Sequence, residues 1–369
     1  MNEMRGQPDR PSITISAVMP CRNEVKCIEP VVRSILDQQT PDGGFEIILA
    51  DGRSEDGTRE ILDRLAEEDE RIRWVDNEKK ITPAGMNVGI QVARGRFIAI
   101  LGAHNRYAHD YLAQAARLLD DHPEYDNVGG SMFLECETDT QQAIAEVFHH
   151  PFAVGGARWH DPEYEGRADT VFGGVYRREV FDRIGLFDEE LVRNQDDEFN
   201  LRLIRSGGII WHSPSIRSWY YPRKTIRAVF DMYRQYGYWK VRVIQKHRIP
   251  ASIRHLIPGL FVFTQVFLLI SILFGTGIAI AGLPVGRWLS GLSGLLFLII
   301  MSVYGLIIGV ASVRLAKRKG RQLLSRIIRA FLAFHYGYGI GFVEGIRDFV
   351  INRTGPSEKR SVLTREQNV

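Results

Sequence analysis

Acidic side chains stand directly after two apolar runs near the start of the 369-residue chain. The first run leads into Pro20-Cys-Arg-Asn-Glu24, and the second into a phrase that reads Asp-Gly-Arg-Ser-Glu-Asp-Gly-Thr over residues 51–58. A carboxylate in such a place, as on Asp51, can accept hydrogen bonds from a base or a ribose, while the glycines permit tight turns. Each phrase alone is also typical of a turn with helix caps, because Ser, Asp and Thr are good N-cap residues. Their occurrence after successive strands indicates a nucleotide site much more strongly.

Four more phrases combine glycines with polar residues. They are Pro83-Ala-Gly-Met-Asn-Val-Gly89, Leu101-Gly-Ala-His104, Phe172-Gly-Gly-Val-Tyr-Arg-Arg178 and Asn194-Gln-Asp-Asp-Glu-Phe-Asn-Leu-Arg-Leu203. In the last of these, Asp196 and Asp197 stand at a predicted helix start, where acids are favourable to the helix dipole whatever their function. That explanation accounts for one aspartate but not for the whole phrase.

Strand and helix signals alternate through the N-terminal part of the chain. The predicted strands are 13–19, 45–50, 72–75 and 97–101, and the predicted helices are 29–39, 58–65, 84–93 and 111–119. This alternation indicates a mostly parallel sheet with helices on both faces, in which ligands bind beyond the carboxyl ends of the strands. The polar phrases stand at those ends.

Taken together, these phrases resemble glycosyltransferase family 2, and most of all the succinoglycan-type exopolysaccharide glycosyltransferases of bacteria. The most specific pieces are the phrase at 51–58, Leu-Gly-Ala-His followed by Tyr107, Val192-Arg-Asn194 with the acids after it, and Tyr220-Tyr-Pro-Arg223. The resemblance covers roughly residues 13–256, two-thirds of the chain. It implies an α/β fold of the GT-A type, with a Rossmann-like mixed sheet and helices on both faces. It also implies inverting transfer of a hexose from a UDP-sugar or a similar nucleotide-sugar donor.

The resemblance assigns site residues by position. Donor binding falls to Pro20, Arg22, Glu24, Asp51, Ser54, Asp56, Asn87, Gly102 and His104. Acceptor binding falls to Gly173, Gly174, Gln195, Tyr238 and Trp239, and the role of catalytic base to Asp196. An inverting transfer needs one carboxylate that takes the acceptor hydroxyl proton, and positive charge that stabilises the leaving diphosphate.

In this family the diphosphate is normally balanced by Mg²⁺ or Mn²⁺ in an Asp-x-Asp or Asp-x-His motif. This chain departs from that pattern, because Gly102-Ala-His104 stands where Asp-Ala-His is expected. Three interpretations stay open: His104 and the diphosphate hold the metal, basic residues such as Arg106 or Lys80 replace it, or the chain binds donor without turnover. The acid expected before the base is also replaced, by Gln195. An active enzyme is the main hypothesis, because the base and the donor phrases are retained.

One phrase bears on the acceptor. Processive synthases of the family carry Gln-x-x-Arg-Trp, and the nearest match here is Gln235-Tyr-Gly-Tyr-Trp239, which lacks the arginine. The difference favours addition of one sugar over synthesis of a long chain. Tyr238 and Trp239 either stack on an acceptor sugar or line a membrane interface.

Two long uncharged stretches occupy the C-terminal third, at residues 256–283 and 289–313. A bilayer core is crossed by about 20 apolar residues, so both stretches predict membrane spans, joined by a short hairpin. Six Lys and Arg residues follow between Arg314 and Arg326, and positive flanks stay cytoplasmic. Two crossings therefore predict a multi-pass membrane protein with its catalytic domain facing the cytoplasm, and the resemblance implies that the membrane is the bacterial inner membrane.

Two further segments carry membrane signals. A third apolar helix is predicted at about 327–350, and its uncharged centre of only 14 residues favours an interfacial or re-entrant helix. A third crossing with a buried Glu344–Arg347 pair stays open. Residues 216–254 interleave basic and aromatic side chains, which we interpret as helices on anionic headgroups rather than as an RNA-binding surface.

Composition limits the expected partners and the cellular compartment. The net charge of +3 gives no bias toward nucleic acid, and the three cysteines match neither a disulfide framework nor a zinc-site spacing, which predicts a reducing compartment. Residues 1–12 predict a flexible lead-in without a secretion signal, and residues 352–369 a polar tail. The other predicted domains are the transferase domain at 13–215, the interface helices at 216–254 and the membrane region at 255–351.

The combined hypothesis is transfer of one hexose, glucose by the resemblance, from a UDP-sugar to a polyprenyl-linked saccharide during exopolysaccharide assembly. A membrane anchor then raises the effective concentration of a lipid-tethered acceptor. Polysaccharide-assembly proteins are the expected protein partners. Two alternatives stay open: a polyprenyl-monophosphate glycosyltransferase, and a non-catalytic donor-binding partner subunit of another transferase.

Overall fold

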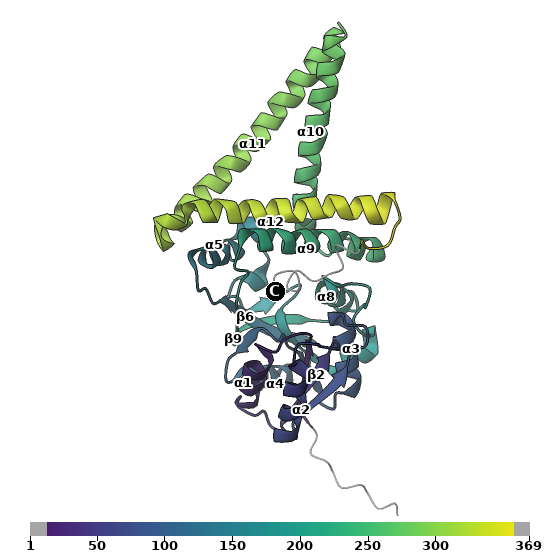
Figure 1. Ribbon diagram of the computed structural model, residues 1–369, viewed down its shortest axis with the longest axis vertical. Coiled ribbons are helices and arrows are strands. Elements are labelled where there is room, and N and C mark those ends of the chain that lie inside the picture. The colour runs from purple at the N-terminus through teal and green to yellow at the C-terminus, as the bar shows by residue number, and fades with distance from the viewer. Residues whose placement is uncertain (1–12, 358–369) are drawn as a thin grey trace, which may run out of the picture. The chain divides into compact units, whose positions relative to one another are not determined.

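The computed structural model describes residues 13–357, so the predictions for 1–12 and 358–369 lie outside the described residues. The described chain forms two compact units. The first contains 13–135 and 158–221, and the second contains 136–157 and 222–357. Figure 1 shows both units and labels many of their elements.

The first unit is built on a mixed sheet, the α/β architecture that the sequence predicts. Its strands are β1 (Ile15–Cys21), β2 (Phe45–Asp51), β3 (Ile72–Asp76), β4 (Phe97–Ile100), β5 (Asn105–Tyr107), β6 (Asn127–Leu134), β7 (Gly166–Arg167), β8 (Phe172–Arg177) and β9 (Ile210–Tyr220). Their order is β3-β2-β1-β4-β8-β6-β9-β5, with β7 paired to β9.

The half of the sheet made by β3, β2, β1 and β4 is parallel. Successive strands of this half are joined by α1 (Ile28–Leu36), α2 (Thr58–Glu68) and α3 (Thr82–Val92), because parallel neighbours need a crossover connection. The strands therefore end at one edge, where Cys21 pairs in register with Asp51 and Asp51 with Asp76. β8 runs antiparallel to β4, so the first residues of β8 lie at this same edge.

Helices cover both faces of this sheet, and the alternation of side chains along each strand decides which face a residue meets. α1, α2 and α4 (Tyr111–Asp121) share a core with Ile15, Ala17 and Met19 of β1. α3, α7 (Arg178–Ile184) and α8 (Gln195–Arg205) share the opposite core with Val18. Both cores are continuous, so the loops at the carboxyl edge rest on a rigid base.

The second unit consists of helices. They are α5 (Asp139–Phe148), α6 (Pro151–Val154), α9 (Ile226–His247), α10 (Ile257–Ile280), α11 (Pro284–Lys319) and α12 (Leu324–Gly345), followed by a π-helical segment (Ile346–Ile351). Residues 136–157, which the sequence analysis places in the transferase domain, group with these helices. The physical reason is apolar burial, because Ile144 and Val147 of α5 share a core with Phe331 and Phe334 of α12.

α9 and α12 lie side by side and run parallel (Figure 1). Gly337, Gly341 and Gly345 stand at four-residue spacing on α12, and a Cβ on each would collide with a backbone carbonyl of α9. The carbonyls are those of Phe230, Arg234 and Tyr238. Glycine at this spacing lets two helix backbones approach closely, as it does in membrane helix pairs. The region predicted as a third apolar helix is therefore joined along its length to α9.

α10 and α11 are long and apolar enough to cross a membrane, by length and composition. The candidate spans are Ile253–Ile280 and Pro284–Lys319, and only 22% and 17% of their most apolar windows are buried inside the structure. Large apolar side chains such as Leu273, Ile280 and Trp288 stay exposed. Such a surface needs an apolar surrounding, which a bilayer supplies.

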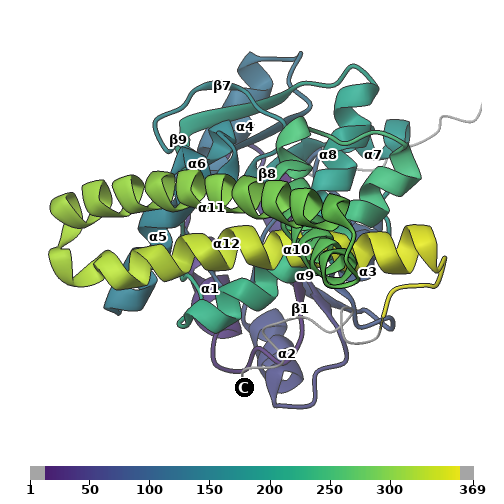
Figure 2. The same cartoon turned by 90° about the horizontal axis from the view of Figure 1, so that it is seen from above.

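Polar side chains join these helices to α12. Tyr336 of α12 donates to Gln265 of α10 at 3.0 Å, and His335 of α12 bonds Tyr304 of α11 at 3.0 Å. Figure 2, seen from above, shows α10 almost end-on while α12 lies across it. α12 is thus steep to α10 rather than a third parallel member of the hairpin. Glu344 accepts from Arg234 of α9 at 3.0 Å, and Arg347 donates to Asp348 at 2.8 Å.

Candidate active site

The loops that follow β1 and β2 are bonded to each other at the carboxyl edge of the sheet. The backbone N–H of Asn23 donates to Ser54 Oγ at 2.8 Å, and that of Glu24 donates to Thr58 Oγ1 at 2.8 Å. Asn23 adopts a left-handed conformation with φ 54°, which asparagine tolerates better than most residues. The Ser, Asp and Thr of the second loop therefore serve the neighbouring loop as well as their own helix.

Asp51 is fully buried at the end of β2, with its carboxylate held by protein donors. Ser54 donates from Oγ at 2.5 Å and from its backbone N–H at 3.1 Å, and Arg59 donates from Nε at 2.7 Å. Arg59 also pairs with Asp76 at the end of β3. The predicted nucleotide-binding acid thus stands in a fixed orientation.

Asp56 holds the second loop together. Burial opposes its charge, but hydrogen bonds from Thr58 and from the Val25 N–H outweigh that effect and lower the pKa of the carboxyl. The predicted donor residues nearby have packing contacts of their own. A Cβ on Gly52 would meet the Arg22 side chain at 3.1 Å, and one on Gly85 would meet Pro20 at 2.9 Å.

Asn87 of α3 ties the helix to the loop before α8. Its Nδ2 donates to the Phe187 carbonyl and to Glu189 Oε1, each at 2.9 Å, and its Oδ1 accepts from the Phe187 N–H at 3.0 Å. The residue is buried. Asn87 therefore holds α3 and the loop before α8 together. The resemblance predicts donor binding at this edge of the sheet.

The loop after β4 closes around Tyr107. The Gly102 N–H donates to the Tyr107 hydroxyl at 2.7 Å, and Asn105 Nδ2 donates to the same oxygen at 3.1 Å. Burial raises the pKa of Tyr107 to about 12, against the hydrogen bonds from Asn105 and Gly102. A Cβ on Gly102 would stand 2.6 Å from Asn105 Nδ2. The space next to Gly102, where the family's acid would begin, is therefore used by an asparagine.

Gly173 and Gly174 are the second and third residues of β8, beside this loop. Gly173 has φ +60°, and its carbonyl accepts from the Tyr111 hydroxyl at 2.5 Å. A Cβ on Gly173 would collide with that hydroxyl, and one on Gly174 would come within 2.7 Å of Asn127 Oδ1. Both glycines are required by close packing, and they bring backbone to the carboxyl edge in place of side chains.

The first turn of α8 carries three acids whose surroundings differ. Glu198 is buried and paired with Arg202 at 2.7 Å, which places it in the core. Asp197 is half-buried, whereas Asp196 is exposed. Burial raises the pKa of the Tyr176 hydroxyl on β8, and the charge of nearby Asp196 raises it further. Asp196, directly after Gln195, is thus an exposed carboxylate close to the strand of Gly173 and Gly174.

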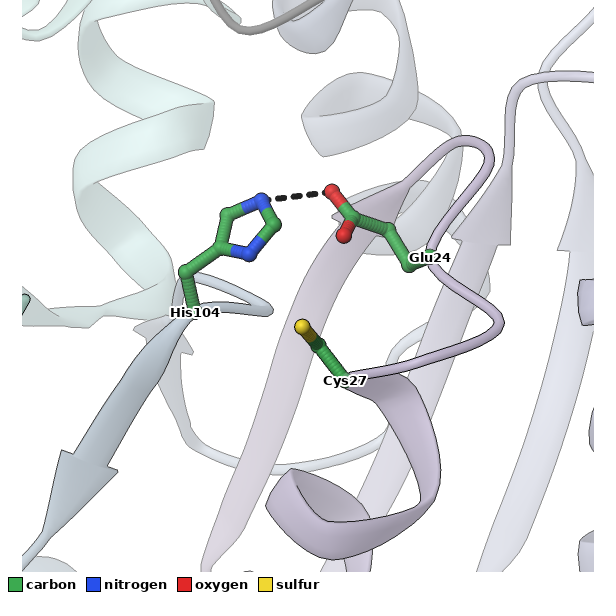
Figure 3. Close-up of side chains that lie close together, drawn as sticks. All are labelled: Glu24, Cys27 and His104. Atoms are coloured by element: carbon green, nitrogen blue, oxygen red, sulfur yellow. Dashed lines mark ion pairs between the residues drawn. The ribbon is translucent and has the colours of Figure 1, made fainter. Parts of the chain in front are cut away.

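Glu24, Cys27 and His104 come together from the loops after β1 and β4 (Figure 3). His104 Nε2 lies 2.5 Å from Glu24 Oε1, and their side chains are 28% and 16% exposed. The ligand atoms of all three residues lie within 4.8 Å of one another. Among residues 13–357, this group of His, Cys and acid side chains could hold a metal ion.

The Asp-x-His arrangement that the family implies does not fit these residues. Gly102 offers no oxygen from a side chain, and Asn105 fills the adjoining space. Arg106, a candidate replacement charge, pairs with Glu135 and stacks 3.9 Å from the Trp219 ring centre, so its charge is already compensated. A divalent ion here would depend on His104 together with ligands from outside that motif.

The two aromatic residues of the predicted acceptor site lie in the second unit. Tyr238 and Trp239 are fully buried, and both pack against Phe349 with ring centres 4.8 and 6.0 Å away. Tyr238 also donates to Asp348 at 3.1 Å. Enclosed in this way, the rings show no open face on which a sugar could stack.

Sequence reasoning missed three residues of this edge. No role is predicted from the sequence for Cys27, whose spacing resembles no zinc site, or for Arg59 and Asn105. The signal for Asn105 was present in the sequence, since a glycine that replaces an acid invites a search for a neighbour that fills its space. Cys27 and His104 are 77 positions apart, so only the fold brings them together.

The family model and the relatives that match this chain agree with one another. Residues 16–185 match the family model described as glycosyl transferase family 2. The succinoglycan biosynthesis protein ExoA of Rhizobium meliloti is 30% identical over 75% of this chain and 83% of its own length. A glucuronosyltransferase of Methanococcus voltae, named for a dolichyl N-acetyl-alpha-D-glucosaminyl phosphate acceptor, is 27% identical over 90% of this chain and 97% of its own.

A solved structure supports the fold. The mannosyltransferase of Pyrobaculum calidifontis, in complex with GDP-Man and Mn²⁺, matches with a TM-score of 0.54 and 16% identity. The match covers 88% of this chain and 86% of that chain. The shared fold therefore extends beyond residues 16–185, which the family model covers.

Proposed function

Because the chain belongs to glycosyltransferase family 2, we propose that it is an inverting hexosyltransferase that moves one sugar from a UDP-sugar to a lipid-linked saccharide. The relatives named above include proteins of exopolysaccharide and lipid-linked glycan synthesis. The chain itself is a glycosyltransferase, and the donor, the acceptor and the stereochemistry are the parts that we propose.

The observation that carries this proposal is the exposed carboxylate of Asp196. Of the three acids in the first turn of α8, Glu198 is committed to Arg202 and Asp197 is half-buried. Asp196 is exposed near β8, where Gly173 and Gly174 bring only backbone to the carboxyl edge. An acceptor hydroxyl can therefore approach this carboxylate without meeting a bulky side chain from Gly173 or Gly174.

The reaction follows from that placement. Asp196 takes the proton of the acceptor hydroxyl while the hydroxyl oxygen attacks the anomeric carbon of the donor sugar. The bond between that carbon and the diphosphate oxygen breaks on the opposite side, so UDP leaves and the configuration inverts. Asp51, fixed by Ser54 and Arg59, holds the nucleoside end of the donor. A bound divalent ion would supply positive charge to the departing diphosphate.

The acceptor is proposed to be attached to a lipid. Two candidate spans, with most of their apolar surface exposed, anchor the chain at a membrane where such acceptors reside. The archaeal relative is named for a dolichyl-linked sugar phosphate, which favours an acceptor of the same chemistry. We propose that the transferase unit is cytoplasmic, because the basic segment from Arg314 to Arg326, which begins at the end of α11, stays with the cytoplasmic face.

Release of UDP tests this proposal. Membranes that contain the full chain are mixed with UDP-glucose, native lipid extract and either Mn²⁺ or Mg²⁺. We expect Asp196→Asn to lower the release rate about 10²–10⁴-fold, because the carboxylate is the general base. Asp197→Asn is the matched control, with the same change of charge one residue away, and should keep most of the activity.

Other outcomes distinguish the alternatives. Turnover that accepts a polyprenyl monophosphate and ignores a lipid-linked saccharide would identify a polyprenyl-phosphate glycosyltransferase. Binding of UDP-sugars without release, for wild type across several donors and acceptors, would contradict the proposal and support a non-catalytic donor-binding subunit. Equal loss in Asp196→Asn and Asp197→Asn would remove Asp196 as the base.

A further inference from the structure

We propose that Glu24, Cys27 and His104 form a three-ligand site for a borderline-soft divalent ion of the Zn²⁺ class, at the carboxyl edge of the sheet. The binding of the ion stands on its own, whereas its part in sugar transfer rests on the proposed function. The site replaces the usual acid-based arrangement with a thiolate, an imidazole and a carboxylate.

The geometry suits a tetrahedral ion. Ligands at about 2.0–2.3 Å from zinc stand about 3.5 Å from one another, so the three atoms need only small side-chain movements from their present spacing. They now lie within 4.8 Å of one another. An ion would enter between Glu24 and His104, which currently face each other at 2.5 Å (Figure 3). Cys27 approaches this pair from the start of α1.

The chemistry of the ligands selects the ion. Mg²⁺ and Mn²⁺ prefer carboxylate, carbonyl and water oxygens, whereas thiolate and imidazole ligands favour Zn²⁺ and neighbouring transition metals. Gly102 has lost the oxygen that would favour Mg²⁺ or Mn²⁺, and Asn105 occupies the vacated space. The loss of the family's acid at Gly102 and the presence of Cys27 therefore both favour Zn²⁺ over Mg²⁺ and Mn²⁺.

The site is open on one side. All three side chains are partly exposed, and three protein ligands leave a fourth position for water or a donor oxygen, as in zinc sites that do chemistry. Glu24 also belongs to the loop bonded to the 51–58 loop, where the donor is proposed to bind. An ion here would therefore lie at the edge of the donor site rather than in a separate structural centre.

Metal binding is tested directly, without sugar substrates. The full chain in detergent, without a histidine tag, is titrated with Co²⁺, and the thiolate-to-cobalt charge-transfer absorption is followed; Zn²⁺ is then added as competitor. Wild type should develop this absorption, and Zn²⁺ should displace it. Cys27→Ser should abolish the absorption, and His104→Ala should weaken Co²⁺ binding by more than about 10-fold.

Cys136→Ser is the matched control, because Cys136 is an exposed thiol of the second unit and should leave the cobalt spectrum unchanged. Loss of the absorption in this variant, or its persistence in Cys27→Ser, would overturn the proposal. Absence of any charge-transfer absorption in wild type would overturn it as well. Asp196→Asn should bind Co²⁺ like wild type, so failure of the metal site and failure of the proposed base give different results.

A second variant keeps the test independent of folding. Cys27 stands at the N-cap of α1, where aspartate is a favourable residue, so Cys27→Asp should fold at least as well as wild type. The hard oxygen ligand should lower the preference for Cd²⁺ over Mn²⁺ by more than about 10-fold, measured by competition. An unchanged preference would show that Cys27 does not touch the ion.

Discussion

Glycine has opposite uses in the two units of this protein. In the transferase unit, Gly57 and Gly173 have positive φ and shape the loops at the carboxyl edge. In the helical unit, Gly337 and Gly341 lie in regular helix and let α9 and α12 approach until carbonyl and Cα are in contact. One unit uses the backbone freedom of glycine, and the other uses its small volume.

The two units also differ in whether certain polar contacts join charged or neutral side chains. The transferase unit buries Asp51, Glu46 and Glu198 and gives each an arginine partner. The exposed apolar helices α10 and α11 make contact with α12 through neutral groups, as in the Tyr336–Gln265 bond. Arginine pairs therefore hold the buried acids of the first unit in place, whereas neutral contacts join α10 and α11 to α12 in the second. Three substitutions test this difference.

The largest expected effect follows from removing the partner of a buried acid. Arg202→Met leaves Glu198 buried without its arginine and removes donors to the Ile184 and Leu186 carbonyls. We expect the transferase unit to lose about 3–5 kcal/mol of stability, measured by hydrogen exchange of α8 and β8. Arg205→Met, on the exposed end of the same helix, is the control and should change little.

The next effect concerns the close approach of α9 and α12. Gly341→Leu places a side chain against the Arg234 carbonyl and should cost about 3 kcal/mol, because two helix backbones must separate. Thermal unfolding in detergent measures the loss. Gly305→Leu on α11, where nothing lies within 4 Å of the added Cβ, should leave the unfolding temperature nearly unchanged. Similar losses in both variants would contradict the idea that packing at Gly341 is special.

The smallest effect tests the buried charge of Glu46. Its carboxylate accepts from Ser16 and from the Arg94 N–H, each at 2.7 Å, and pairs with Arg73. Burial opposes the charge, but these contacts together lower the pKa of Glu46. Glu46→Gln should cost about 1–2 kcal/mol near neutral pH.

The pH dependence follows from the sign of that shift. A lowered pKa in the folded state adds stability that is present above the unfolded pKa of about 4.3 and is lost as the pH falls through the folded value. The stability of wild type should therefore fall more steeply below about pH 4 than that of Glu46→Gln. Denaturant midpoints at several pH values measure this, with exposed Glu60→Gln as control. Parallel curves for wild type and Glu46→Gln would refute the assignment.

The order of the elements was predictable because it depends on local pattern. Alternating strands and helices from Ile15 to Asp121 appear near their predicted places, since β-branched runs and helical spacing are short-range signals. The two candidate spans were predictable for the same reason, because length and lack of charge identify such helices. The resemblance to family 2, which the comparisons confirm, also rested on short motifs.

Other features required the tertiary structure. Residues 136–157 look like part of the transferase domain in the sequence, but their apolar side chains are buried with α12. Tyr238 and Trp239 look like a stacking platform, but both rings are enclosed against Phe349. A sequence gives the period of burial along one helix, but not which distant helix covers that face.

The amino-acid sequence by itself determined the family, the α/β alternation and the two long apolar helices, since each depends on residues near one another in the chain. That Asp196 is the base stays a prediction. Only the tertiary structure decided that Asn105 fills the space beside Gly102, and that Cys27 and Glu24 meet His104. The physical reason is that parallel strands end at a common edge. Loops far apart in the sequence therefore become neighbours there, and the chemistry of the site belongs to their combination.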